Sequence, residues 1–408
     1  MPKKAMLITV GTGKDRKDIA QAICLSIREQ NPNLVKFITS DKTEKETLPL
    51  ILENPVMKER PQENIVIQDE NDVEKIYKEC KQVLQKVISE GYEVSVDYTS
   101  GTKAMSAGAC LAAVSQRANT LVYTHGARDT TGRVIPGTER MYALYPNLIY
   151  IDQDHHRFVL FFNKYSFSTC LEIAKDVKNK CERPEVQEQW NFLEKLAFAY
   201  YAWDKFELKE ASDFLNQIDK SPYLQTYGLK SKIERHKQIL HKEQNNNYCE
   251  ERIIDLLQNA RRRAKEGKFD DAVARLYRLL EYLAQYVLYT KYNGFETSTP
   301  NYDKLETKEI KEKYKDKKLG LTQAYSILRD LRSPLGNAFF DRGYDKKLSI
   351  RNDSILAHGF NPVGKGGYPK LLEILENMLK EIIPEIDTKQ KDFTFPELTG
   401  QPCERVMR

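Results

Sequence analysis

YEVSVDYTSGTKAMSAGACLAAV, residues 92–114, is the stretch that decides the fold of the first part of the chain. Residues 92–99 alternate β-branched or aromatic side chains with polar ones, which is typical of a strand. Residues 102–116 then have the small and apolar side chains of a helix that packs closely on a sheet. We expect the turn Ser100-Gly101-Thr102-Lys103 to lie at the carboxyl end of a parallel strand, where open α/β sheets bind ligands.

The same alternation of strand and helix runs through the first 150 residues. Four further short apolar segments predict strands at residues 5–10, 34–39, 64–68 and 120–124. Residues 16–30 and 72–90 have helical periodicity. This order predicts a Rossmann-like α/β domain with a mostly parallel sheet and helices on both faces. Residues 133–146 and 148–152 predict a hairpin and an edge strand.

After about residue 160 the strand signal nearly vanishes. Residues 166–182 and 185–242 predict helices, with a helical hairpin that turns near Asp204. Residues 241–250 are polar and rich in Asn, which indicates a junction between two helical regions. We therefore expect an all-α connector followed by an all-α domain, whose last 20 residues look like a tail.

Composition excludes several classes of protein. The chain has 408 residues, of which 40% are hydrophobic and 30% charged, as in a globular protein of two or three domains. No apolar run approaches the roughly 20 residues of a membrane span, and the N-terminus lacks a signal-peptide pattern, so we expect a cytoplasmic protein with no membrane partner. The seven cysteines form no CxxC pair, so neither a disulfide framework nor a zinc site is expected. The net charge of +5 is concentrated in the C-terminal part and is compatible with contact to RNA.

Two strand-to-helix turns predict a binding site for phosphate groups. Glycines allow a ligand to approach the backbone, and a helix N-terminus with hydroxyls and a lysine attracts anions. The candidate ligand-binding residues are Thr9, Gly11, Thr12, Gly13, Thr99, Ser100, Gly101, Thr102 and Lys103. Their spacing fits neither the dinucleotide fingerprint nor the P-loop. The alternative is that the second turn only caps a helix.

Three residues after the strand at 120–124 are further candidates for the same ligand: His125, Arg128 and Arg133. Each of them alone is more often an ordinary surface residue.

SIRNDSILAHG, residues 349–359, is the most informative stretch of the second half. In a helix, Arg351 and His358 would lie two turns apart on nearly the same face. Histidine transfers protons near neutral pH, and arginine stabilises charge on phosphate oxygens, while Asn352 would orient either group. These catalytic candidates predict metal-free RNA cleavage by attack of the 2′-hydroxyl. The alternative is a helix with a structural histidine.

Arg275 and Arg278 could also approach this site, although solvated positions opposite four leucines are favoured for them.

Both motifs resemble known families. Thr9–Gly13 and Asp97–Met105 are similar to the CARF domain, the Rossmann-like ligand sensor of type III CRISPR auxiliary proteins, although Ser100 replaces a frequent glycine. Arg351-Asn352 followed by His358 resembles the motif of HEPN ribonucleases, at the long end of its spacing. Together the resemblance to CARF–HEPN ribonucleases covers residues 1–155 and 250–385.

The resemblance implies a CARF sensor domain at residues 1–160, a helical connector at 161–247 and a HEPN ribonuclease domain at 248–408. It implies an endoribonuclease of antiviral defence that binds cyclic oligoadenylate, cA4 or cA6, across a homodimer and cleaves single-stranded RNA without a metal cofactor. The catalytic site would be composite, with Arg351, Asn352 and His358 from both subunits. Two alternatives remain: a ligand-sensing regulator or scaffold without nuclease activity, and a sensor that also degrades its own cyclic ligand.

Overall fold

The structure is a computed structural model that divides into two units, Met1–Gln153 and Asp154–Arg408, here called the N-terminal unit and the helical unit. It describes residues 2–130, 134–135, 137–181, 183–305, 308–315, 318–344, 360, 362–363 and 366–399.

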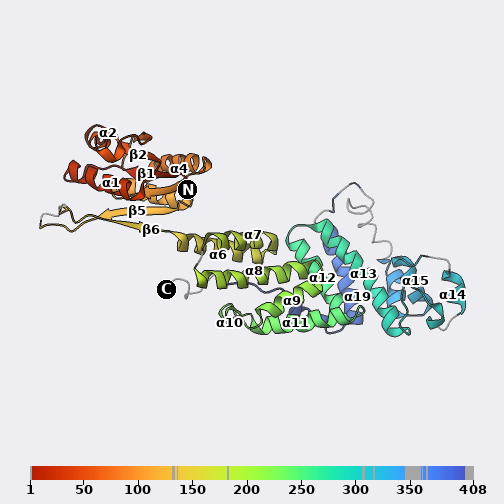
Figure 1. Cartoon of the computed structure of the whole chain (residues 1–408). Coiled ribbons are helices and arrows are strands. Elements are labelled where there is room, and N and C mark those ends of the chain that lie inside the picture. The colour runs from red at the N-terminus through yellow and green to blue at the C-terminus, as the bar shows by residue number, and fades with distance from the viewer. Residues whose placement is uncertain are drawn as a thin grey trace. The chain divides into compact units, whose positions relative to one another are not determined.

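The N-terminal unit contains a sheet of six described strands in the order β3-β2-β1-β4-β5-β6. Their bounds are β1 (Lys4–Thr9), β2 (Leu34–Ser40), β3 (Gln62–Ile67), β4 (Glu93–Asp97), β5 (Thr120–His125) and β6 (Arg140–Leu144). The first five are mutually parallel, and β6 pairs antiparallel with β5 (Figure 1). The predicted mostly parallel sheet is therefore confirmed. The strand order reverses between β1 and β4, and such a switch point opens a crevice at the carboxyl edge.

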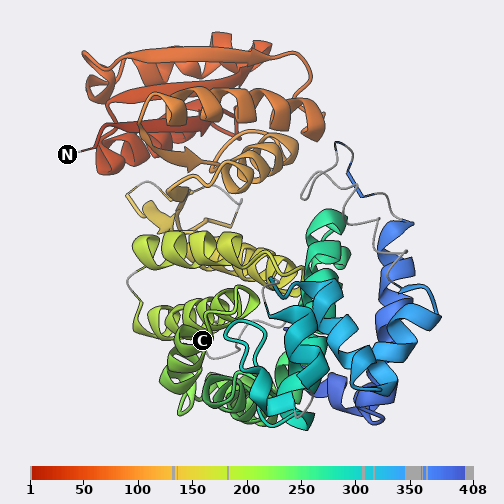
Figure 2. The same cartoon turned by 90° about the vertical axis from the view of Figure 1, so that its right-hand side faces the viewer.

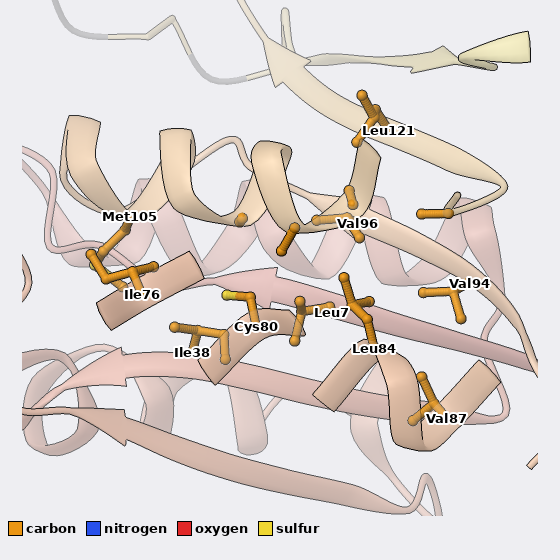
Figure 3. Close-up of a cluster of buried hydrophobic side chains, with 14 of the residues drawn as sticks. Leu7, Ile38, Ile76, Cys80, Leu84, Val87, Val94, Val96, Met105 and Leu121 are labelled. Carbon is orange, nitrogen blue, oxygen red and sulfur yellow. The ribbon is translucent and has the colours of Figure 1, made fainter. Parts of the chain in front are cut away.

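Helices cover both faces of this sheet. They are α1 (Arg16–Gln30), α2 (Asp41–Glu46), α3 (Leu48–Leu52), the 3₁₀ turn η1 (Pro55–Met57), α4 (Val73–Ser89) and α5 (Lys103–Ser115). Ile76 and Leu84 of α4 pack with Leu7 and Val96 of the sheet in the core that α5 closes (Figure 3). Gly108 of α5 has no side chain, and a Cβ there would lie 2.7 Å from Cγ2 of Ile76. The small residues of α5 thus let two helices approach closely.

One predicted strand is wrong. Residues 148–152 lie in α6 (Asn147–Asn163), so the described sheet ends at β6 on this side. Tyr150, Ile151, Phe158 and Phe162 are buried at the spacing of a helical face. The five-residue apolar segment is too short to distinguish a strand from a helix by its own periodicity.

The helical unit contains only helices and connecting segments in its described residues (Figure 2). Its first part comprises the end of α6 and α7 (Phe167–Lys180), α8 (Pro184–Asp204), α9 (Leu208–Ile218), α10 (Tyr223–Thr226) and α11 (Lys230–Asn245). The predicted hairpin turn near Asp204 is confirmed, because α8 ends at that residue. Helix α11 extends into the polar segment 241–250, so only four residues separate it from the next helix.

The second part begins with the long hairpin of α12 (Glu250–Lys265) and α13 (Phe269–Lys291). It continues with η2 (Tyr302–Leu305), α14 (Lys308–Tyr314), α15 (Leu321–Asp330), α16 (Pro334–Asp341), α19 (Gly367–Ile382), α20 (Ile386–Lys389) and η3 (Gln390–Phe393). A buried ion pair and a buried hydrogen bond connect it to α8: Arg262 Nε lies 2.8 Å from Asp204 Oδ1, and the Trp203 indole donates to Asp255 Oδ2 at 2.7 Å.

The predicted C-terminal tail is wrong for residues 389–399, which pack against the helical unit. Phe395 is 6% exposed, and its ring lies 4.7 Å from that of Tyr200 and 3.8 Å from the Arg262 guanidinium. The Asn163 side chain donates to Leu398 O at 2.9 Å and accepts from Leu398 N at 2.8 Å. These aromatic and main-chain contacts explain why residues 389–399 pack against the helical unit although many of them are polar.

None of the helices in the described parts of the chain combines the length and apolar character needed to cross a bilayer. The six cysteines within those parts are free thiols, and five of them are buried. Cys403 lies outside the described residues.

Candidate functional site

The two predicted turns lie side by side in the N-terminal unit. Strand β1 ends at Thr9 and β4 ends at Asp97, and the register of this parallel pair places Ile8 opposite Asp97. Residues 10–13 and 98–102 therefore leave the sheet at the same carboxyl edge, at the switch point of the strand order. The structure thus brings together all nine candidate residues of the phosphate site.

Reciprocal hydrogen bonds join the two turns. The Ser100 hydroxyl donates to Thr9 O at 2.6 Å and accepts from the Gly11 N–H at 3.2 Å. In return, the Thr9 hydroxyl donates to Ser100 O. Thr9 is 1% exposed and Ser100 5% exposed, so these bonds are buried. The two hydroxyls hold the turns together and are not presented to solvent.

The two glycines are required where the turns meet. A Cβ on Gly11 would lie 2.3 Å from the main-chain nitrogen of Gly101, which no real contact tolerates. Gly101 itself has φ of +101°, a conformation that side-chain-bearing residues rarely adopt. Close main-chain approach thus accounts for the glycine at both positions.

The two remaining threonines of the second turn also serve the main chain. The Thr99 hydroxyl accepts from Thr124 N at 2.8 Å. Thr102 is the N-cap of α5, where its hydroxyl accepts from Met105 N at 3.1 Å and donates to Glu70 O. Capping, the alternative to a ligand contact, is therefore part of what this turn does. It leaves Lys103, which is exposed in the first turn of α5, as a cation at this edge.

Asp97 is a residue whose position the strand pattern did not reveal. It is fully buried below the second turn, and its Oδ1 accepts from the Thr99 N–H at 2.8 Å. Burial raises the pKa of this carboxyl, while hydrogen bonds from Thr99 and Ser26 act against the rise. Asp97 thereby fixes the start of the turn from beneath.

The additional candidates lie at the end of β5 and in the segment that follows it. His125 is the last residue of β5 and is exposed, and its ring stacks on Tyr123 with centroids 6.2 Å apart. Arg128 forms an isolated bridge with Val134. Arg133 lies outside the described residues. Sequence reasoning missed the stacked pair of Tyr98 and Tyr123, whose rings lie 5.5 Å apart beside the second turn.

The catalytic candidates Arg351, Asn352 and His358 lie outside the described residues. The chain just after them is anchored on the start of α13: Val363 N donates to Asp270 Oδ1 at 2.9 Å.

Arg278 is exposed on α13, as expected for a solvated position. Arg275 is half-buried and donates to Asp271 O at 3.2 Å. The four leucines that those arginines were predicted to oppose, Leu276, Leu279, Leu280 and Leu283, are all buried.

In the part of the chain that the structure describes, no group of three or more His, Cys, Asp or Glu side chains is placed to hold a metal ion.

Comparison with known proteins assigns both parts of the helical unit. The family model described as the Csm6 6H domain matches residues 150–246, and the one described as the Csm6 HEPN domain matches residues 241–382. In solved structures, Enterococcus italicus Csm6 bound to cyclic hexa-2′-fluoro-hexa-dAMP has a similar fold, with a TM-score of 0.56 and 15% sequence identity. That likeness covers 96% of this chain and 99% of the other. No match is found among curated proteins.

A Rossmann-like α/β unit with two adjoining strand-to-helix turns, followed by a helical HEPN region, defines a protein of the CARF–HEPN class. The two matched domains together span residues 150–382, more than half of the chain. The chain belongs to the Csm6 family.

Proposed function

We propose that this chain is an endoribonuclease of type III CRISPR defence that cyclic oligoadenylate activates. The observation that carries the proposal is the match to the Csm6 HEPN domain over residues 241–382, because this range contains the whole Arg351-Asn352…His358 motif. The fold likeness to a Csm6 protein bound to a cyclic oligoadenylate analogue supports the same class of activator here. We assign residues 1–160 to the sensor, 161–247 to the connector and 248–408 to the nuclease.

We place the activator at the edge formed by residues 9–13 and 99–103. Because Thr9, Ser100 and Thr102 already bond to the main chain, their role is to shape the turns. The phosphates are then bound by Lys103, by main-chain N–H groups at the start of α5, and by the glycine-rich first turn at Thr12 and Gly13, where the backbone is accessible.

A homodimer completes both sites in this proposal. A ring of adenylates with two-fold symmetry fits a symmetric pair of such edges. Exposed apolar side chains on the β5–β6 ribbon and the residues after it support self-association of the N-terminal unit. They are Tyr123, Tyr142, Leu144, Tyr145 and Ile149, of which Tyr142 is 58% exposed.

At the nuclease site, His358 transfers the proton between the 2′-hydroxyl, the leaving oxygen and solvent, and Arg351 stabilises charge on the phosphate. Asn352 orients the phosphate or the histidine. A single histidine cannot act as general acid and general base at once, and a second copy from the partner subunit supplies the missing group. This chemistry uses no metal ion.

The test is RNA cleavage by the purified protein with cyclic tetra-adenylate, with cyclic hexa-adenylate and without activator. We expect cleavage of single-stranded RNA that depends on one of these rings and persists in EDTA. His358→Ala should abolish cleavage and leave activator affinity unchanged. Activity retained by His358→Ala, or lost in EDTA, would contradict the proposed chemistry.

A further inference from the structure

We propose that the helical unit carries a binding strip for single-stranded RNA, formed by Lys205, Lys265 and Lys391 on two pockets that meet at Tyr165. The proposal rests on the proposed nuclease function and extends it to a site away from the Arg351…His358 motif. Its substrate is the ribose–phosphate backbone of RNA that the nuclease cleaves.

The first pocket, of about 260 Å³, lies between the start of α7, the end of α8 and the α12–α13 turn. Its lining includes the exposed Lys205 and Lys268 and the hydroxyl-bearing residues Ser166 and Thr169. Neither hydroxyl makes a side-chain hydrogen bond to another described residue, and Ser166 leaves the N-cap of α7 unfilled. The pocket thus offers a ligand both cations and two hydroxyls whose side chains have no hydrogen-bond partner among the described residues.

The second pocket, of about 340 Å³, adjoins the first at Tyr165. Lys265 and Lys391 are exposed on its lining, beside Arg261 and Phe395. Lys265 Nζ lies 3.4 Å from the Tyr165 hydroxyl, which places this cation at the boundary of both pockets. The linings together contain eight basic residues and three acidic ones, so basic side chains predominate on the combined surface.

The arginines and the lysines of this surface differ in availability. Arg261 and Arg263 are paired with carboxylates, Arg261 with Glu376 at 2.7 Å and Arg263 with Glu266 at 2.9 Å. Among the described residues, by contrast, no carboxylate lies within ion-pair distance of the lysines of the strip. We therefore assign the structural role to the arginines and phosphate binding to Lys205, Lys265 and Lys391.

The shape and place of the strip favour a single strand of RNA. Two basic pockets in series, with an aromatic side chain where they meet, match the pattern by which proteins follow a single-stranded backbone. Lys268 of the first pocket is two residues from Asp270, which binds the main chain of Val363. Val363 stands five residues after His358 in the sequence, so the first pocket is close to a described residue that follows the catalytic motif along the chain.

The test is a triple variant with Lys205→Gln, Lys265→Gln and Lys391→Gln, made both in the active protein and in the His358→Ala background. In the second background, binding of labelled single-stranded RNA should weaken about tenfold or more. The magnitude of the slope of log affinity against log salt concentration should decrease by about 2, because each of the three lost phosphate contacts contributes roughly 0.7 to it. In the active protein, KM for RNA should rise while kcat at saturating RNA and the activator affinity stay unchanged.

The matched control removes three exposed lysines elsewhere, Lys78→Gln, Lys180→Gln and Lys311→Gln, with the same change in net charge. Equal RNA affinity of the two triple variants would overturn the strip. Loss of activator affinity instead of RNA affinity would assign the surface to the activator and also overturn it. Failure of the wild type to cleave RNA would refute the nuclease proposal, whereas the binding assay in the His358→Ala background would still decide the strip.

Discussion

The two units of this protein bury different numbers of charged side chains: among the described residues, the N-terminal unit buries Lys36 and Asp97, whereas the helical unit buries Asp154, Asp204, Glu243, Asp255 and Arg262. In the N-terminal unit, hydroxyls and main-chain groups are buried: Thr9 and Ser100 bond to each other's carbonyls, and the Ser26 hydroxyl lies 2.7 Å from that of Thr124. In the helical unit, the buried polar groups include charges such as Arg262 and Asp255. Neutral hydrogen bonds cost little to bury, whereas charges are costly unless their pairing is complete. The helical unit should therefore be the more sensitive of the two to internal substitutions.

Tryptophan fluorescence separates the two units experimentally. The chain has two tryptophans, and both of them, Trp190 and Trp203, lie buried in α8. Their emission consequently reports unfolding of the helical unit alone, whereas circular dichroism reports both units.

The largest effect is expected for Phe395→Ala. Phe395 is enclosed by Tyr200, Trp203 and Arg262, so its removal leaves a cavity and exposes the buried guanidinium. We expect a loss of roughly 3–5 kcal/mol in the stability of the helical unit, seen as a lower denaturation midpoint by tryptophan fluorescence.

The matched control is Phe360→Ala, because Phe360 is 91% exposed and should contribute little to stability. Equal denaturation midpoints for the two alanine variants would show that residues 389–399 do not stabilise the helical unit. They would also contradict the expectation that this unit is the more sensitive one to internal substitutions.

A pH dependence of intermediate size should arise at His236. Burial lowers the pKa of His236 to about 3, with Lys232 adding to the effect, and its ring bonds to the Tyr200 hydroxyl and to Asp392 O. In the unfolded chain the imidazole has a pKa near its ordinary value. As the pH falls, the unfolded chain therefore binds a proton at this histidine at a higher pH than the folded state does. The stability that it contributes is complete above about pH 6.5 and is lost as the pH falls towards 3.

Between pH 7 and pH 4 this loss should reach about 3 kcal/mol. Glu243 acts in the opposite direction, because burial raises its pKa and protonation then favours the folded state. The measurement is therefore the difference in unfolding free energy between wild type and His236→Gln across this range. A difference that does not change with pH would contradict a neutral, buried His236.

The errors made from sequence share one physical cause. The strand order and the pairing of the two turns follow from local periodicity and from glycine positions such as Gly101, which the sequence displays directly. Residues 148–152 and Phe395 differ from the prediction because their partners lie far away in the sequence: the Tyr150 hydroxyl donates to Ala118 O at 3.0 Å, and the Phe395 ring packs on Trp203. In the same way, spacing placed Ser100 at the edge of the sheet, but it did not show that its hydroxyl is already bonded to Thr9.

The smallest effect, and the sharpest test of the N-terminal unit, is Lys103→Ala. Lys103 is exposed in the first turn of α5, so its loss should leave the unfolding of both units unchanged. If it binds an activator phosphate, affinity for the cyclic oligoadenylate should fall about tenfold, or about 1.4 kcal/mol, as titration calorimetry would show. The control is Lys86→Ala, an exposed lysine in the last turn of α4, where the helix runs away from the ligand edge. Equal activator affinity in the two variants would mean that the turns bind the ring through the main chain alone, and only the glycines would then be essential to the site.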